Sequence, residues 1–188
     1  KWTSGAAIAL AILAALGMIV SFTLMILLYV QRESKIILSS TWQFMLLILF
    51  GSALGYGSMF TWIGRPSPYI CGLRIWLPPM AFVLIIAPLL SKTWRLHRIF
   101  TLHELKVAPI PLWRLILVCS CVVIVQLIIC ILWIAIGTVK TELVNDTNDR
   151  NVAYVVCKLN LANKVASYVT YGYLGCCMVV GAYLAFRV

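Results

Sequence analysis

Residues 5–30 read GAAIALAILAALGMIVSFTLMILLYV, a continuous apolar stretch without a single charged side chain. A helix of about 20 apolar residues crosses the roughly 30 Å hydrocarbon core of a bilayer. A cleaved signal peptide, by contrast, has an apolar core of only about 7 to 15 residues. This stretch therefore predicts a membrane-spanning helix.

Four further apolar stretches follow, at 36–63, 75–91, 115–139 and 165–186. The second of these is shorter, but Arg74 and Lys92 at its ends can snorkel toward the lipid headgroups and lengthen it. None alternates polar and apolar residues as the strands of an outer-membrane barrel do. Because helices satisfy their own backbone hydrogen bonds in lipid, we predict an all-α, polytopic transmembrane helix bundle. Its expected helices, in one transmembrane domain over 1–188, cover roughly 5–30, 37–63, 71–99, 113–138 and 163–186.

The overall composition supports a membrane protein. Hydrophobic residues make up 63% of the chain, charged residues only 11%, and the mean hydropathy is +1.03. Soluble domains carry about 25% charged residues, so this chain lacks the polar surface they need. The net charge of +10 arises from short basic clusters between the apolar stretches. Such clusters orient membrane proteins, so we expect no nucleic-acid partner.

The connectors between the apolar stretches predict which side each one faces. The first connector holds Arg32 and Lys35, and the third is strongly basic. The basic residues in and around the third are Lys92, Arg95, Arg98, Lys106 and Arg114. Short loops rich in Lys and Arg stay in the cytoplasm, so both connectors should face inward and the N-terminus outward. The longest connector, the fourth, carries the glycosylation sequon Asn145-Asp146-Thr147, which fits an outer position unless the sequon is unused.

Two of the seven cysteines lie outside the apolar stretches. Cys71 stands at the predicted outer end of the third helix and Cys157 in the long fourth connector. In an oxidising exterior a disulfide between them is the default, and two free thiols are the alternative. The other five lie inside predicted helices, where cysteine behaves as a small apolar residue; they are Cys119, Cys121, Cys130, Cys176 and Cys177.

The sequence contains no pattern that predicts an enzyme or a cofactor. It lacks the zinc-protease, nucleophile-elbow and phosphate-loop motifs, and none of its five acidic residues lies within an apolar stretch. His97 and His103 are six residues apart in a basic segment, which is no metal-site spacing. We therefore expect no catalytic residues, no metal and no cofactor. Prolines at 78, 79 and 88 should kink the third helix, either for packing or to shape a cavity.

Several segments resemble class C G-protein-coupled receptors. Residues 71–77 (CGLRIWL) are similar to the entrance of the third helix in that family, and most of all in its metabotropic GABA-B branch. Residues 91–100 (SKTWRLHRIF) resemble its cytoplasmic signature, and 35–40 (KIILSS), Gly51 and Tyr56 resemble its second helix. Residues 181–186 (GAYLAF) are similar to the end of its fifth helix. The adjacent Pro78 and Pro79 depart from the family pattern, as does Pro88.

The resemblance implies a G-protein-coupled receptor of the plasma membrane. Ligand would bind an extracellular module outside this chain, receptor dimers would rearrange, and the bundle would engage a heterotrimeric G protein. Lys35, Arg95, Arg98 and Lys106 would contact the G protein or membrane lipids. Lys92 would hold the inactive state by an ionic contact with a sixth helix. Helices six and seven would also lie outside these residues, so we expect a fragment of a longer receptor.

Two other classes of membrane protein fit the composition. A channel or transporter subunit would need a conductive path or an ionisable site near the midplane, and the apolar stretches hold no acid. A structural polytopic membrane protein needs no such feature. A rhodopsin-type receptor fits poorly, because the third helix ends without an Asp/Glu-Arg-Tyr triplet.

Overall fold

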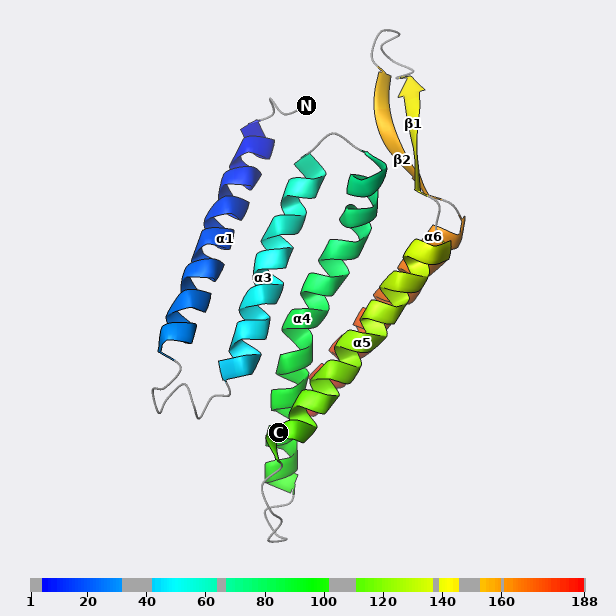
Figure 1. The fold of residues 1–188 in the computed structure, drawn as a ribbon. Helices are drawn as coiled ribbons and strands as arrows, with labels where there is room; N and C mark the ends of the chain where they lie inside the picture. The colour runs from blue at the N-terminus through cyan, green and yellow to red at the C-terminus, as the bar shows by residue number, and fades with distance from the viewer. Residues whose placement is uncertain are drawn as a thin grey trace.

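The computed structural model describes residues 5–31, 42–63, 67–101, 111–136, 139–145, 153–159 and 161–187. Within these ranges five long helices and one β-hairpin follow one another along the chain (Figure 1). The elements are α1 (Gly5–Val30), α3 (Trp42–Ile63), α4 (Pro68–Thr101), α5 (Leu112–Ile136), β1 (Val139–Asn145), β2 (Ala153–Leu159) and α6 (Leu161–Phe186). All five helices are long and apolar enough to cross a membrane, which confirms the predicted fold class.

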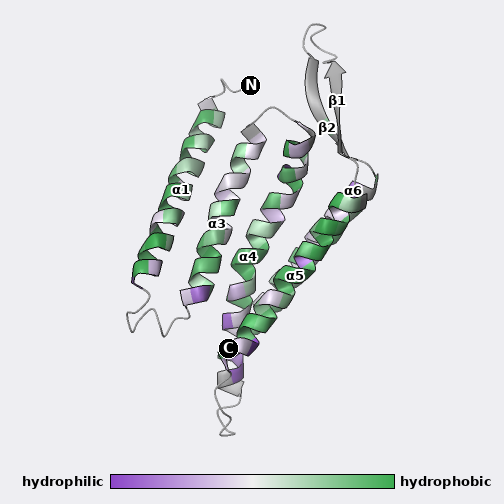
Figure 2. Ribbon diagram, viewed as in Figure 1, coloured by the Kyte–Doolittle hydropathy of each residue, from purple (hydrophilic) through white to green (hydrophobic). Residues whose placement is uncertain are grey.

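Helix α4 lies at the centre of the bundle. It packs against α3, α5 and α6, whereas α1 packs chiefly against α3 (Figure 1). Many large apolar side chains point away from the bundle, among them Ile12 at 56% exposure and Ile134 at 60%. Figure 2 shows apolar residues along all the helices, with polar residues gathered toward the lower end of α4. Such an outer surface suits a hydrocarbon solvent and would be unstable in water.

The observed helix bounds differ from the expected ones by a few residues. Helix α4 begins at Pro68 and reaches Thr101, so it is longer at both ends than the expected 71–99. Helix α6 begins at Leu161 rather than at 163. Residues 37–41 and 137–138, which we also expected to be helical, lie outside the described residues.

The start of α4 has the features of a stable helix N-terminus. The Ser67 hydroxyl accepts a hydrogen bond from the backbone N–H of Ile70 at 3.3 Å, and Pro68 occupies the first helical position. Serine caps the free N–H groups there, and proline fits because its missing N–H is not needed. Pro78, Pro79 and Pro88 lie inside the helix, which remains continuous past them.

Small residues allow the helices to approach one another closely. A β-carbon at Gly17 of α1 would lie 2.5 Å from the Tyr56 ring of α3. One helical turn farther on, the Ser21 and Ser52 hydroxyls are 3.2 Å apart and form a hydrogen bond between the same two helices. In lipid, where no hydrophobic effect drives helices together, such close packing and hydrogen bonds hold a bundle together.

The fourth connector folds into a hairpin that the sequence analysis did not predict. Strands β1 and β2 pair antiparallel, from Val139 opposite Leu159 to Asn145 opposite Ala153. The two segments contain four Val, one Thr and one Tyr, residue types that favour strands. The connector's polar composition predicted only a loop. Pairing satisfies its backbone groups, and the hairpin projects beyond the helix ends (Figure 1).

Candidate functional site

The N-terminal end of α4 is joined covalently to the hairpin. Cys71, in the first turn of α4, forms a disulfide with Cys157 of β2, with Cα atoms 6.0 Å apart. Cys71 is only 1% exposed, so the bond lies against the helix rather than in an open loop. The pairing is the one expected from the position of these two cysteines outside the apolar stretches. The two cysteines are 86 positions apart in the sequence, and the bond closes the chain between them into one covalent loop.

One turn farther along, Arg74 links α4 to the end of α3. Its Nε donates a hydrogen bond to the backbone carbonyl of Thr61 at 2.7 Å. Its guanidinium also lies over the Trp62 ring, 5.5 Å from the centroid. The last carbonyls of a helix have no partner within it, and a cation there complements the helix dipole. Arg74 therefore holds the C-terminal end of α3 and the N-terminal end of α4 together.

Two hydrogen bonds connect α5 with α6 inside the membrane region. Trp133 Nε1 donates to the Asn163 carbonyl at 3.4 Å near the hairpin. Nearer the middle, the Tyr173 hydroxyl donates to the Val122 carbonyl at 2.8 Å. These contacts fix the register of α6 on α5 without any charged group.

The α5 face turned toward the bundle also buries an amide. Gln126 is fully buried, and its Nε2 donates to the Cys130 sulfur at 3.3 Å. Its Oε1, like the indole N–H of Trp76 on α4, finds no hydrogen-bond partner among the described residues. An unsatisfied amide oxygen is costly in an apolar interior. Our sequence reasoning missed Gln126, although it is the only Gln, Asn or charged residue within the apolar stretch 115–139.

The opposite end of α4 carries the basic residues expected to face the cytoplasm. Lys92 and Arg95 are half-buried, and Arg98 is exposed, with its guanidinium 5.7 Å from the centroid of Trp94. In the described ranges the only acidic residue is Glu142, which belongs to β1 at the other end of the bundle. Lys35 and Lys106, the other two expected contact residues, lie outside the described residues.

The predicted glycosylation site lies at the tip of the hairpin. Asn145 is the last residue of β1 and pairs with Ala153. The remainder of its sequon, Asp146 and Thr147, lies outside the described residues. The backbone therefore carries Asn145 to the same side of the bundle as the disulfide, away from Lys92 and Arg98 (Figure 1).

The disulfide, Arg74 and the basic residues Lys92, Arg95 and Arg98 all involve the same helix, α4. A single continuous helix, α4, runs from the disulfide and Arg74 at one end to the basic cluster at the other. The described residues contain no group of three or more His, Cys, Asp or Glu side chains that would hold a metal ion. A displacement of the hairpin would be passed directly to α4 through the disulfide.

Comparison with known proteins agrees with this architecture. Residues 1–188 match the family described as "7 transmembrane sweet-taste receptor of 3 GCPR", the seven-helix domain of class C receptors. The chain is 24% identical over 187 residues to metabotropic glutamate receptor-like protein G of Dictyostelium discoideum, covering 98% of this chain and 23% of that protein. It is 28% identical over 166 residues to protein A of the same organism and series, covering 87% of this chain and 21% of that protein.

The chain thus spans less than a quarter of the length of these curated relatives. The family match nevertheless covers every residue, and it includes all five helices and the hairpin. The family consists of receptors, not enzymes. By its helices, its disulfide and the match over its full length, the chain belongs to the transmembrane-domain family of class C G-protein-coupled receptors, and it is a multi-pass membrane protein.

Proposed function

We propose that this chain is part of a plasma-membrane receptor that relays extracellular ligand binding to heterotrimeric G proteins. The observation that carries the proposal is the position of α4. This helix is bonded to the hairpin at Cys71 and carries Lys92, Arg95 and Arg98 at its other end. A bundle with two arrangements would pass a change at one end to the other. The ligand would bind a module outside these residues, which is consistent with the greater length of the relatives.

The proposed orientation places the hairpin outside the cell and the basic end of α4 inside. Two independent features support it. The excess of Lys and Arg in the short connectors favours the cytoplasm. The disulfide and the sequon at Asn145 both require the secretory or extracellular side. Together they support an extracellular N-terminus.

The cytoplasmic surface would bind the G protein by charge. Lys35, Arg95, Arg98 and Lys106 supply positive charge for acidic side chains of that partner. Lys92 stands deeper, half-buried on α4, where an ammonium group favours a nearby anion. We propose that a carboxylate on a sixth helix pairs with Lys92 and stabilises the inactive arrangement. No such carboxylate lies near it among the described residues.

The branch of the family and the assembly remain part of the same proposal. Residues 71–77 (CGLRIWL) and 181–186 (GAYLAF) favour a GABA-B-like receptor. Receptors of this architecture would signal as dimers. The relatives are named for metabotropic glutamate receptors, and the proposal assigns no ligand to this chain.

A chimera tests the relay directly. The full-length protein containing this chain is given the extracellular module of a class C receptor whose ligand is known. Ligand-dependent nucleotide exchange is then measured on purified G proteins in vesicles. We expect exchange to rise with ligand, and a control chimera with a mutated ligand pocket to show no rise. No ligand-dependent exchange with any G-protein class, in a chimera that binds ligand, would contradict the proposal.

A channel or transporter subunit is the alternative. Its one structural support is the buried amide of Gln126, since polar groups near the midplane mark pathways in such proteins. The same vesicles distinguish the two functions, because a channel or transporter would give ligand-dependent ion flux without nucleotide exchange. A purely structural membrane protein would give neither signal.

A further inference from the structure

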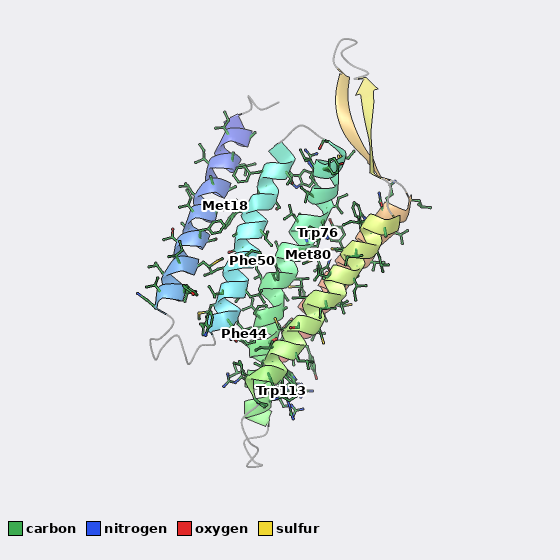
Figure 3. All side chains as sticks on the ribbon, in the orientation of Figure 1. Met18, Phe44, Phe50, Trp76, Met80 and Trp113 are labelled. Atoms are coloured by element: carbon green, nitrogen blue, oxygen red, sulfur yellow. A yellow bond between two sulfur atoms is a disulfide. The ribbon has the colours of Figure 1, made fainter. Side chains whose placement is uncertain are left out.

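Three exposed arginines gather at one end of the bundle, each stacked on an aromatic ring. Arg98 of α4 lies 5.7 Å from the centroid of Trp94, and Arg114 of α5 lies 5.4 Å from that of Trp113. Just past the end of α6, Arg187 lies 5.5 Å from the Tyr183 ring centroid. Sequence reasoning counted Arg114 only as a loop charge and did not use Arg187. Figure 3 labels Trp113 at this lower end.

The three arginines lie at similar levels along the axis of the bundle, which is called their depth below. Helices α4, α5 and α6 all contact one another. Helices α4 and α6 run in the same direction, and a β-carbon at Gly181 of α6 would lie 3.0 Å from Leu90 of α4. Arg187 is six residues beyond Gly181 and Arg98 eight beyond Leu90, so their depths differ by about 3 Å at 1.5 Å per residue.

Helix α5 runs the opposite way and brings the third arginine to the same end. The Cys119 side chain of α5 lies within hydrogen-bond reach of Ser91 of α4. Counted toward this end of the bundle, Arg114 is five residues from Cys119 and Arg98 is seven residues from Ser91, so their depths also differ by about 3 Å. The Cα atoms of all three arginines therefore lie within about one helical turn of one another in depth. Packed helix axes are about 8 to 10 Å apart, a span that extended arginine side chains can bridge.

This end has an uncompensated positive charge in the part of the chain that the structure describes. Among the described residues the only acidic one is Glu142, which belongs to β1 at the far end of the bundle. The first backbone N–H groups of α5, which starts at Leu112, add the partial positive charge of a helix N-terminus. Paired guanidinium donors bind phosphate oxygens two at a time, which a lysine cannot do.

The surroundings of the cluster favour a lipid over a soluble anion. Apolar side chains just above the arginines are exposed on both outer helices: Ile116, Leu117, Val179 and Val180. Trp113 and Tyr183 are also more than half exposed, at 59% and 56%, as aromatic residues at the headgroup level of a bilayer are. Acyl chains can lie along this apolar surface while a headgroup sits among the arginines.

We propose that the ends of α4, α5 and α6 that carry Arg98, Arg114 and Arg187 bind the headgroup of a polyphosphorylated inositol lipid. Three separate guanidiniums match a ring with several phosphates better than a headgroup with one negative charge. The site deepens the proposed function, because in the proposed orientation it faces the cytoplasmic leaflet. A lipid bound there would bridge the inner ends of three helices, including the one that carries Lys92.

Lipid binding by the full-length receptor tests the site. The receptor is placed in phosphatidylcholine nanodiscs that contain a small fraction of phosphatidylinositol bisphosphate, and bound lipid is measured by native mass spectrometry. We expect the triple variant Arg98→Gln, Arg114→Gln, Arg187→Gln to bind at least tenfold less of this lipid. The triple Lys variant, which keeps the charge but loses the paired donors, should be intermediate. Lys164→Gln, which removes an exposed charge at the other end of α6, should bind as the wild type does.

The same experiment can overturn the proposal in three ways. Equal binding of phosphatidylserine at matched total charge would show charge anchoring without headgroup recognition. Equally tight binding of soluble inositol trisphosphate to receptor in detergent would make a free phosphate the ligand. Unchanged lipid binding by the folded triple Gln variant would remove the arginines from the site. Because lipid binding is measured without a G protein, a failure of the signalling proposal leaves this result interpretable.

Discussion

Gly51 of α3 faces Ala81 of α4 so closely that a β-carbon at Gly51 would lie 3.0 Å from the Ala81 carbonyl oxygen. The same β-carbon would lie 2.9 Å from the β-carbon of Leu84. Neither atom is the end of a flexible side chain, so the helices would have to separate. This contact sets how closely α3 can pack on the central helix.

Substitution at Gly51 should therefore destabilise the bundle. We expect Gly51→Ala to cost about 1–3 kcal/mol, the usual range for overpacking a close contact. Gly55→Ala is the matched control, since a β-carbon there meets only Ala81 Cβ at an ordinary 3.7 Å. Thermal unfolding of the purified full-length receptor, followed by size-exclusion fluorescence, measures both. Equal stability of the two variants would show that α3 and α4 are not packed as described.

Replacing Gln126 by leucine should be tolerated or stabilising. The buried amide makes one hydrogen bond, to the Cys130 sulfur, while its oxygen has no partner among the described residues. Leucine removes that unsatisfied oxygen and keeps the volume, a change that is nearly neutral or gains about 1 kcal/mol. Gln126→Glu should destabilise strongly, because it buries a carboxyl group in the same place. A large loss of stability in Gln126→Leu would reveal a partner for the amide that these residues do not contain.

The Cys71–Cys157 bond should be required for stable surface protein. Loss of a native disulfide typically costs about 2–4 kcal/mol, and here it also frees the hairpin from α4. We expect Cys71→Ser and Cys157→Ser to lower surface expression to the same extent as each other and as the double variant. Cys121→Ser, at an exposed free cysteine on α5, serves as control. Non-reducing peptide mass spectrometry that found both cysteines as free thiols in surface protein would refute the pairing.

Asn145 should carry a glycan when the full-length protein is made in eukaryotic cells. The reason is its position at the hairpin tip, on the side of the disulfide. Asn145→Gln should abolish the mobility shift produced by glycosidase, whereas Asn151→Gln, in no sequon, should leave it intact. The opposite orientation would be indicated by an absent shift together with protection of this hairpin from protease in sealed vesicles.

Lys92→Ala should raise ligand-independent G-protein turnover in the complete receptor. A contact that biases the inactive state by about 1.4 kcal/mol changes the equilibrium tenfold. Lys164→Ala, at an exposed position near the hairpin end of α6, should leave basal turnover unchanged. Turnover per receptor is measured after correction for surface amount. Reduced expression with normal basal turnover per receptor would mean that Lys92 only anchors α4.

The spans and the disulfide could be predicted because they depend on local composition. A bilayer leaves few alternatives for an uncharged stretch such as 5–30, since its backbone must form its own hydrogen bonds. Cys71 and Cys157 stood out because they alone lie outside the apolar stretches. The hairpin was missed because short strands form by pairing with each other, and a polar connector gives only a weak signal of that pairing.

The sequence by itself determined five membrane spans, their order, and the basic and cysteine-bearing connectors, because hydropathy and charge act residue by residue. Only the tertiary structure decided which helices touch. It put α4 at the centre, brought Arg74 to the Thr61 carbonyl, and gathered Arg98, Arg114 and Arg187 at one end. In lipid every apolar face is equally soluble, so helix neighbours are chosen by close packing and hydrogen bonds. Those depend on shape in three dimensions, which hydropathy does not encode.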